Sequence, residues 1–73
     1  MPPKLPLKPR EIIKRLKLLG FVCDHTTDSH EVYYHASSKR RAVVPIHTKE
    51  LPKGTVKAIV REAGIDLDDF LIG

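Results

Sequence analysis

The sequence has a single cysteine, no apolar run long enough to cross a membrane, and no signal-peptide pattern. Cys23 therefore cannot form a disulfide within the chain, which excludes a disulfide-stapled scaffold and suits a reducing compartment. One cysteine with scattered histidines is also a poor set for a structural zinc site, which usually takes four ligands in close pairs. We expect a cytoplasmic protein that has no bound metal or other cofactor and no membrane association.

The 73 residues predict one domain with a modest core, because a short chain buries a smaller share of its surface than a long one. Hydrophobic residues make up 41% and charged residues 30% of the chain, which fits a folded domain rather than a disordered segment. Prolines cluster in the first nine residues. We therefore predict a flexible tail over residues 1–8 and a single domain over residues 9–73.

Charge is distributed unevenly along the chain. All 13 Lys and Arg residues lie within residues 1–61, whereas residues 62–73 contain four acidic residues and no basic one. A strongly basic body favours a polyanionic partner, and nucleic acid is the first candidate. The alternative is that the basic side chains only keep a small protein soluble, and charge alone does not decide between the two.

Three segments show the features of helices. Over residues 9–19, apolar residues recur at helical spacing between a proline at the first position and a glycine C-cap. Residues 52–63 repeat this pattern. A short third helix is predicted over residues 66–72, because Asp66 is a suitable N-cap and acidic residues fill the first turn.

Three short strands separate the two longer helices. The segments 21–26, 30–36 and 40–46 contain strand-forming residues and are joined by short polar turns, which imply an antiparallel meander. Pro45 cannot donate a hydrogen bond to a neighbouring strand, so we expect it at an edge or at a strand end. Cys23 is expected to be a small core residue of the first strand.

The order of these elements predicts the fold class. It is α+β, α-β-β-β-α, with a three-stranded antiparallel sheet that has both amphipathic helices on one face. The opposite face of the sheet is then free to bind a partner.

The histidines are the residues best suited to chemistry. An imidazole can accept or donate a proton near neutral pH. RNA cleavage without a metal needs both actions, because a base activates the 2′-hydroxyl and an acid protonates the departing 5′-oxygen. His30 opens the second strand, where a side chain can be exposed and still be held by the sheet, and strict alternation puts His35 on the opposite strand face. His25 and His47 are further candidates, although each histidine taken singly is more simply a surface residue.

Basic side chains that could contact phosphate occur in two places. Lys39, Arg40 and Arg41 form a run at the second hairpin, next to two tyrosines that could stack on bases if they face outward, although at least one should pack against the helices. Lys53 and Lys57 lie on the first turns of the second long helix, where free N–H groups favour a phosphate. The first set has the simpler alternative of solvated loop charges, and the second has that of a loose helix start.

Several short motifs occur in an order and spacing that resemble a known family. They are Leu19-Gly20-Phe21, Ser29-His30, Val44-Pro45-Ile46-His47, Lys49-Glu50-Leu51, Gly54-Thr55 and Ala63-Gly64. Over residues 9 to about 65 the chain resembles the HicA family of mRNA interferase toxins. The resemblance implies a double-stranded-RNA-binding-domain-like fold. It also implies a type II toxin–antitoxin toxin that cleaves mRNA as a metal-independent endoribonuclease.

The resemblance also implies site residues and partners. The family's catalytic histidine matches His30, while Ser29 is a candidate supporting residue and His47 and Lys49 are candidates for the general acid on position alone. The implied partners are mRNA and a HicB-type antitoxin that covers the active site, with a monomeric free toxin and a hetero-oligomeric complex. The family commonly has glycine before the Ser-His pair, whereas this chain has Asp28, whose carboxylate could repel phosphate or orient His30.

Two other functions stay open at this point. A non-catalytic RNA-binding module with the same basic surface would bind RNA in a salt-dependent way and leave it intact. A protein-interaction domain would serve mainly to hold an antitoxin-like partner, which would also stabilise a small domain.

Overall fold

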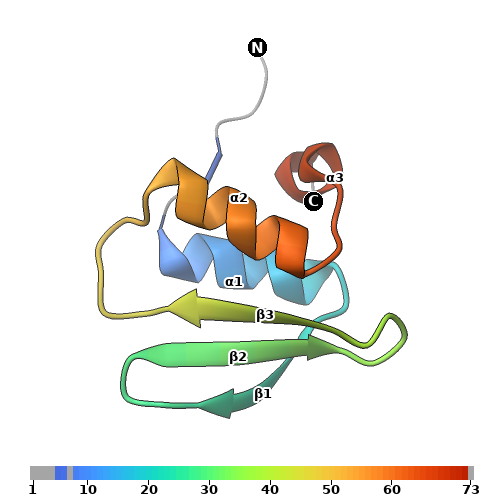
Figure 1. Ribbon diagram of the computed structural model, residues 1–73, viewed down its shortest axis with the longest axis horizontal. Coiled ribbons are helices and arrows are strands. Elements are labelled where there is room, and N and C mark those ends of the chain that lie inside the picture. Colours follow the sequence, from blue (N-terminus) through green and yellow to red (C-terminus); the bar gives the residue numbers. More distant parts are fainter. Residues whose placement is uncertain (1–4, 7, 73) are drawn as a thin grey trace.

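The computed structural model describes residues 5, 6 and 8–72. Its elements are α1 (Pro9–Leu18), β1 (Val22–Thr26), β2 (His30–His35), β3 (Arg40–Pro45), α2 (Lys53–Glu62) and α3 (Leu67–Ile72). The sheet is antiparallel with β2 in the centre (Figure 1). The predicted α-β-β-β-α order and the short third helix are both confirmed. No helix in the described part of the chain is long and apolar enough to cross a membrane.

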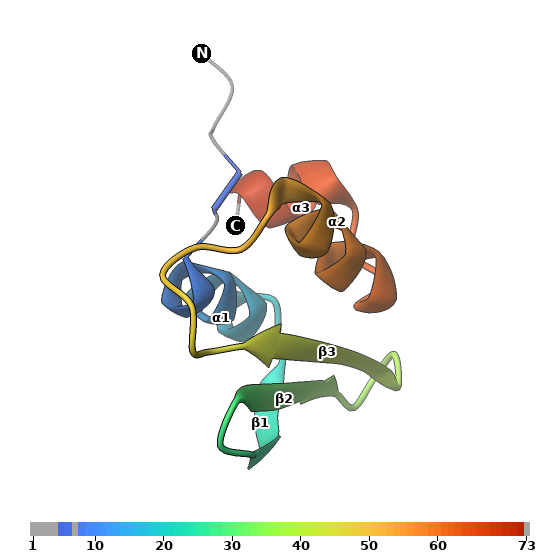
Figure 2. The same cartoon turned by 60° about the vertical axis from the view of Figure 1, so that its left-hand side comes forward.

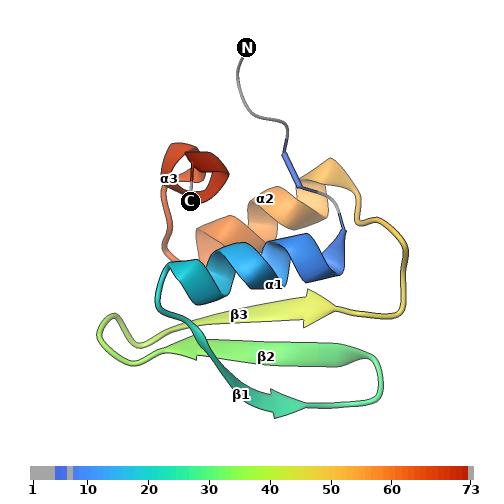
Figure 3. The same cartoon turned by 180° about the vertical axis from the view of Figure 1, so that it is seen from behind.

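Two layers make up the domain. Helices α1 and α2 lie together on one side of the sheet and pack mainly on β3 (Figures 1 and 3). The core between the layers combines the apolar stripes of the helices with alternate sheet positions, and burying these side chains drives the packing. Its fully or nearly fully buried members include Ile12, Leu16, Tyr33, Ala42, Val44, Val56, Ile59 and Val60. None of the helices that the structure describes lies on the other side of the sheet, as predicted, and we call that side the open face.

Both long helices are followed by the predicted glycines. Gly20 follows α1 with a φ of 97° and Gly64 follows α2 with a φ of 70°, which is the left-handed region that glycine adopts at least cost. After α2, the N–H of Ile65 donates to the carbonyl of Val60 and closes the last turn. A Cβ atom at Gly64 would also lie only 2.9 Å from Nε of Arg40, so that flexible side chain would have to shift.

The predicted N-terminal tail lies partly within the described residues. Residues 1–4 and 7 are outside them. Leu5 packs against the hydrophobic core and Pro6 is buried, whereas Lys8 is exposed directly before α1. The packed chain therefore includes two positions that we assigned to the tail.

Cys23 is exposed, so the prediction that it lies in the core is wrong. It belongs to β1, which is an edge strand on which neither helix packs closely, and all five residues of β1 are exposed. The apolar character of a strand does not distinguish an edge strand from a central one.

The two tyrosines take different roles, as expected. Tyr33 is buried in the core, and its hydroxyl donates a 2.5 Å hydrogen bond to the carboxylate of Glu31. Burial, followed by the hydrogen bond and the charge of Glu31, raises the pKa of Tyr33 well above its ordinary value. Tyr34 is half-buried on the open face.

The short helix α3 lies beside α2, on the side of the helical layer farthest from β1 (Figure 2). Phe70 is fully buried in the core. At the N-terminus of α3, Asp66 acts as the predicted N-cap, since its side chain accepts the N–H of Asp68 at 2.9 Å. Near the C-terminus, the Arg15 guanidinium donates to the carbonyls of Phe70 and Leu71 at 2.9 and 2.7 Å. These carbonyls carry partial negative charge that a cation stabilises.

We predict that Arg15→Ala lowers the free energy of unfolding by about 1.5–3 kcal/mol, because hydrogen bonds from a charged donor to the last carbonyls of α3 are lost. Urea denaturation followed by circular dichroism measures the change. The matched control is Lys14→Ala, an exposed neighbour on α1, which should change the same quantity by less than about 0.5 kcal/mol. Equal losses in the two variants would contradict the role of Arg15.

Candidate active site

His30 is the first residue of β2 and follows a tight turn from β1. The N–H and the hydroxyl of Thr27 donate to the His30 carbonyl at 2.8 and 3.2 Å, and the His30 N–H donates to the Thr27 hydroxyl at 3.0 Å. The turn is also joined to the end of β3, because the Ile46 N–H donates to the Ser29 carbonyl at 2.9 Å. These bonds fix the backbone of His30 and leave its side chain half-buried.

Ser29 orients the imidazole of His30. The Nδ1 atom of His30 lies 2.7 Å from the hydroxyl oxygen of Ser29. When Nδ1 donates this hydrogen bond, Nε2 carries the lone pair and can act as a base. The Asp28 carboxylate, by contrast, forms no hydrogen bond or ion pair with any residue that the structure describes. Ser29 rather than Asp28 is therefore the residue in contact with the ring.

His47 links two loops at this site. Its Nε2 atom donates to the carbonyl of Asp28, which joins the loop after β3 to the turn before β2. This contact occupies one ring nitrogen and holds the turn in place. The geometry therefore gives His47 a positioning contact beside His30.

Basic side chains gather at the end of the domain that contains His30. Successive elements run in opposite directions, so the starts of α1, β2 and α2 and the end of β3 share this end, which we call the His30 end (Figure 1). An open hollow there is lined by Lys8, Arg10, Ile46, Thr48, Lys49 and Glu50. Lys53 begins α2 and Lys57 follows one turn later, and both are exposed. Lys8 and Arg10 are not among the predicted site residues, although the alternating direction of the elements could have indicated them.

The predicted basic run at the second hairpin lies at the opposite end of β2. This six-residue strand separates the hairpin from His30 by about 20 Å. Its three members also face different ways. Lys39 occupies the turn with a φ of 59°, the Arg40 side chain packs on Gly64, and Arg41 lies on the open face. The structure therefore does not bring this run together with His30.

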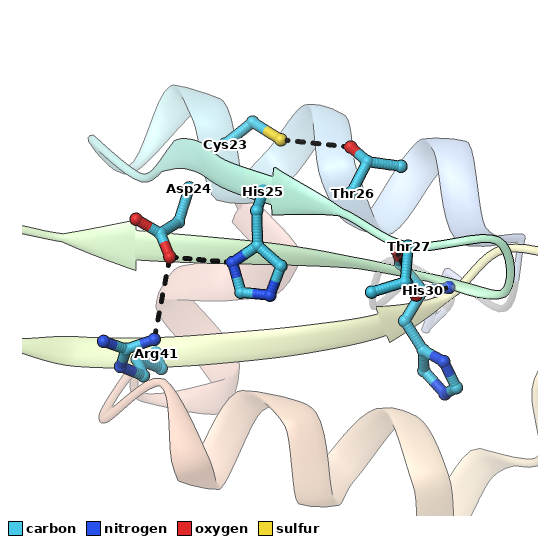
Figure 4. A network of polar contacts seen from close by, with 7 residues as sticks. All are labelled: Cys23, Asp24, His25, Thr26, Thr27, His30 and Arg41. Atoms are coloured by element: carbon cyan, nitrogen blue, oxygen red, sulfur yellow. Dashed lines mark hydrogen bonds and ion pairs between the residues drawn. The ribbon is translucent and has the colours of Figure 1, made fainter.

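A second polar cluster lies on the open face and was not predicted as a unit. The Asp24 carboxylate accepts a hydrogen bond from Nδ1 of His25 at 2.9 Å and lies 3.7 Å from the Arg41 guanidinium (Figure 4). The Arg41 guanidinium carbon lies 5.4 Å from the centre of the Tyr34 ring. A register shift between Cys23 and His25 marks a bulge in β1, which re-aims side chains and brings Asp24 to its neighbour's ring. No local sequence signal indicates this bulge.

His35 has a packing role on the helix-covered face, opposite to His30 as predicted. Its ring centre lies 5.0 Å from that of Phe21. Its Nδ1 atom accepts the N–H of Ser38 at 3.2 Å and lies 2.9 Å from the Ser38 hydroxyl, which stabilises the hairpin between β2 and β3. Within residues 5, 6 and 8–72, no group of three or more His, Cys, Asp or Glu residues could hold a metal ion.

Comparison with known proteins identifies one family. The family model described as the HicA toxin of bacterial toxin–antitoxin systems matches residues 9–65, which run from α1 through α2 and include the whole His30 turn. No curated protein matches the chain. Toxins of such systems act together with a cognate antitoxin, so the family implies an antitoxin as a partner. Because the match covers most of the 73 residues, the chain belongs to the HicA family of toxins from bacterial toxin–antitoxin systems.

Proposed function

We propose that this toxin is a metal-independent endoribonuclease that cleaves mRNA with His30 as a catalytic residue. The observation that carries the proposal is the His30 imidazole, which Ser29 contacts at Nδ1 at the basic end of the domain. Membership of a toxin family supports the same class of activity. A HicB-like antitoxin that covers the His30 end would keep the toxin inactive in the cytoplasm, and the free toxin would be a monomer.

The proposed reaction is a transesterification within the RNA strand. Nε2 of His30 removes the proton of a 2′-hydroxyl, and the 2′-oxygen attacks the adjacent phosphorus. The bond between phosphorus and the 5′-oxygen then breaks, which leaves a 2′,3′-cyclic phosphate on one product and a 5′-hydroxyl on the other. Proton transfer by a positioned imidazole contributes about 10²–10⁴-fold to the rate of such a step.

Cations at the His30 end supply the electrostatic part of the mechanism. Ammonium and guanidinium groups stabilise the charge that develops on the phosphorane. Lys49 and Arg10 line the hollow beside the loop after β3, and we assign to them contacts with the phosphates next to the scissile group. Lys53 and Lys57 on the first turns of α2 extend the same surface for phosphates farther along the strand. Contacts to the second hairpin would need an RNA that extends along β2.

We predict that His30→Ala reduces cleavage of RNA by at least about 100-fold, because the proton acceptor of the reaction is lost. Labelled RNA incubated with the purified protein and separated on a gel measures cleavage, and circular dichroism checks the fold. The turn should survive, since its hydrogen bonds come from the backbone and from Thr27. Expression of the variant should also relieve growth arrest.

Two outcomes of this experiment would count against the proposal. Cleavage by His30→Ala at the parent rate would show that His30 is not catalytic. RNA that is bound but left intact by the folded, antitoxin-free parent would favour the alternative of a non-catalytic RNA-binding module.

We also predict that the His30 end contributes most of the phosphate contacts. The measurement uses the His30→Ala variant, which keeps RNA intact, and adds Arg10→Gln and Lys49→Gln to it. These two changes should reduce the slope of log K, where K is the RNA-binding constant, against the logarithm of salt concentration by about 1.4, because each lost contact with a single strand accounts for about 0.7. The matched control is Lys14→Gln with Lys17→Gln, which removes the same charge from exposed positions farther along α1. Titrations at several salt concentrations give the slopes. Equal slopes for the two pairs would place the RNA elsewhere.

A further inference from the structure

We infer that His25 is the second proton-transfer group of the reaction and serves as the general acid, with His30 as the general base. The inference rests on the proposed ribonuclease function and deepens it. The cluster that contains His25 lies on the open face of the sheet and has no role in the mechanism described so far. Its position, its hydrogen bonds and its charge each support the assignment.

The strand register places the two histidines on the same face of the sheet. His25 lies opposite Val32, and His30 precedes Val32 by two residues on β2. His25 and His30 are therefore diagonal neighbours across two antiparallel strands, a relation in which Cα atoms are about 7–8 Å apart and long side chains can meet. Figure 4 shows His25 and His30 along the same pair of strands, with His30 nearer the turn. We infer from this placement that one phosphodiester group on the open face lies between the two rings.

The partners of the two Nδ1 atoms differ in charge, and this difference assigns the roles. His25 Nδ1 donates to the Asp24 carboxylate at 2.9 Å, whereas His30 Nδ1 contacts the neutral Ser29 hydroxyl at 2.7 Å. A carboxylate can only accept a hydrogen bond, so Nδ1 of His25 is fixed as a donor, whereas a hydroxyl can either donate to Nδ1 of His30 or accept from it. We therefore assign proton donation to the ring beside Asp24 and proton acceptance to the ring beside Ser29.

The cluster remains accessible and is not negatively charged overall. The His25, Asp24 and Arg41 side chains are 54%, 43% and 62% exposed. The guanidinium of Arg41 lies near the Asp24 carboxylate and offsets its charge, so an RNA phosphate meets a cation rather than an unpaired anion. Arg41 also lies over the Tyr34 ring, whose outer edge stays on the same face. These positions suit a strand that passes over the sheet.

The step is balanced without any other reactant. Nε2 of His30 takes the proton of the 2′-hydroxyl as the bond between the 2′-oxygen and phosphorus forms. The bond between phosphorus and the 5′-oxygen breaks, and the proton on Nε2 of His25 passes to that oxygen. The two rings finish with their protonation exchanged, and proton exchange with solvent restores the starting state.

A leaving group that needs no proton tests this role directly. The experiment uses an RNA oligonucleotide with one mapped cleavage site and a second oligonucleotide in which sulfur replaces the bridging 5′-oxygen at that site. We expect His25→Ala to slow cleavage of the ordinary RNA by at least about 100-fold and that of the sulfur RNA by less than about 3-fold, since a thiolate departs without general acid catalysis. His30→Ala should slow both substrates. Circular dichroism checks that each variant folds, and His25→Gln serves as a second variant of closer shape.

Three results would overturn the inference. In the first, His25→Ala cleaves the ordinary RNA at the parent's rate. In the second, His25→Ala slows cleavage of both substrates by the same factor. In the third, His47→Ala rather than His25→Ala slows cleavage of the ordinary RNA alone. If the parent cleaves RNA and His30→Ala does not while His25→Ala is unchanged, the ribonuclease proposal stands and this inference alone fails. If the folded parent cleaves neither substrate, both fail.

Asp24 is a positioning residue in this scheme and has its own test. Asp24→Asn keeps the shape of the side chain and removes its charge. It should therefore slow cleavage of the ordinary RNA several-fold more than cleavage of the sulfur RNA. Glu62→Gln is the matched control, because it removes one carboxylate from an exposed position on α2. If Asp24→Asn and Glu62→Gln gave the same ratio of the two rates, Asp24 would have no part in proton donation.

Discussion

The turn between β1 and β2 is the constraint on which the rest of the site depends. Thr27 closes it through its N–H and its hydroxyl, and Ile46 joins it to the end of β3 through the Ser29 carbonyl. These hydrogen bonds, together with the one from His47 to the Asp28 carbonyl, do not use the His30 ring, so the ring is left free for chemistry. A backbone held in this way positions a side chain without the rotational freedom that a mobile loop would retain. The Ser29 contact at Nδ1 then fixes which ring nitrogen faces the solvent.

The alternating direction of the elements places basic side chains from other elements at the same end of the domain as this turn. Because α1, β2 and α2 all start at the same end, Arg10, His30 and Lys53 belong to that end although the sequence separates them widely. The acidic residues of α3 lie on the side away from this end (Figure 1). A polyanion therefore meets basic side chains beside the histidine, which favours its association with this end of the domain. A single strand that extends from the His30 end over the open face would reach His25 and Arg41 next.

Much of the fold follows from sequence pattern, whereas the grouping of side chains follows from pairing between strands. Helical spacing, glycine caps and short turns predict each element to within about two residues, because these signals are local. The bulge at Asp24 depends on how β1 pairs with β2, so its contact with His25 has no local signature. The sequence predicts Cys23 in the core because it does not show which strand lies at an edge. Arg40 and Arg41 are adjacent in the sequence but belong to opposite faces of β3, so the basic run does not form one basic surface.

In the proposed reaction, a 2′-hydroxyl attacks the phosphorus after an imidazole removes its proton. The most direct test is to compare an RNA oligonucleotide that the protein cleaves at one mapped site with the same oligonucleotide carrying 2′-deoxyribose at the nucleotide before that site. We expect the ordinary RNA to yield a 2′,3′-cyclic phosphate and a 5′-hydroxyl end, as seen by mass spectrometry, and the substituted RNA to stay intact at that bond. Cleavage of the substituted bond at a similar rate would contradict the proposed reaction.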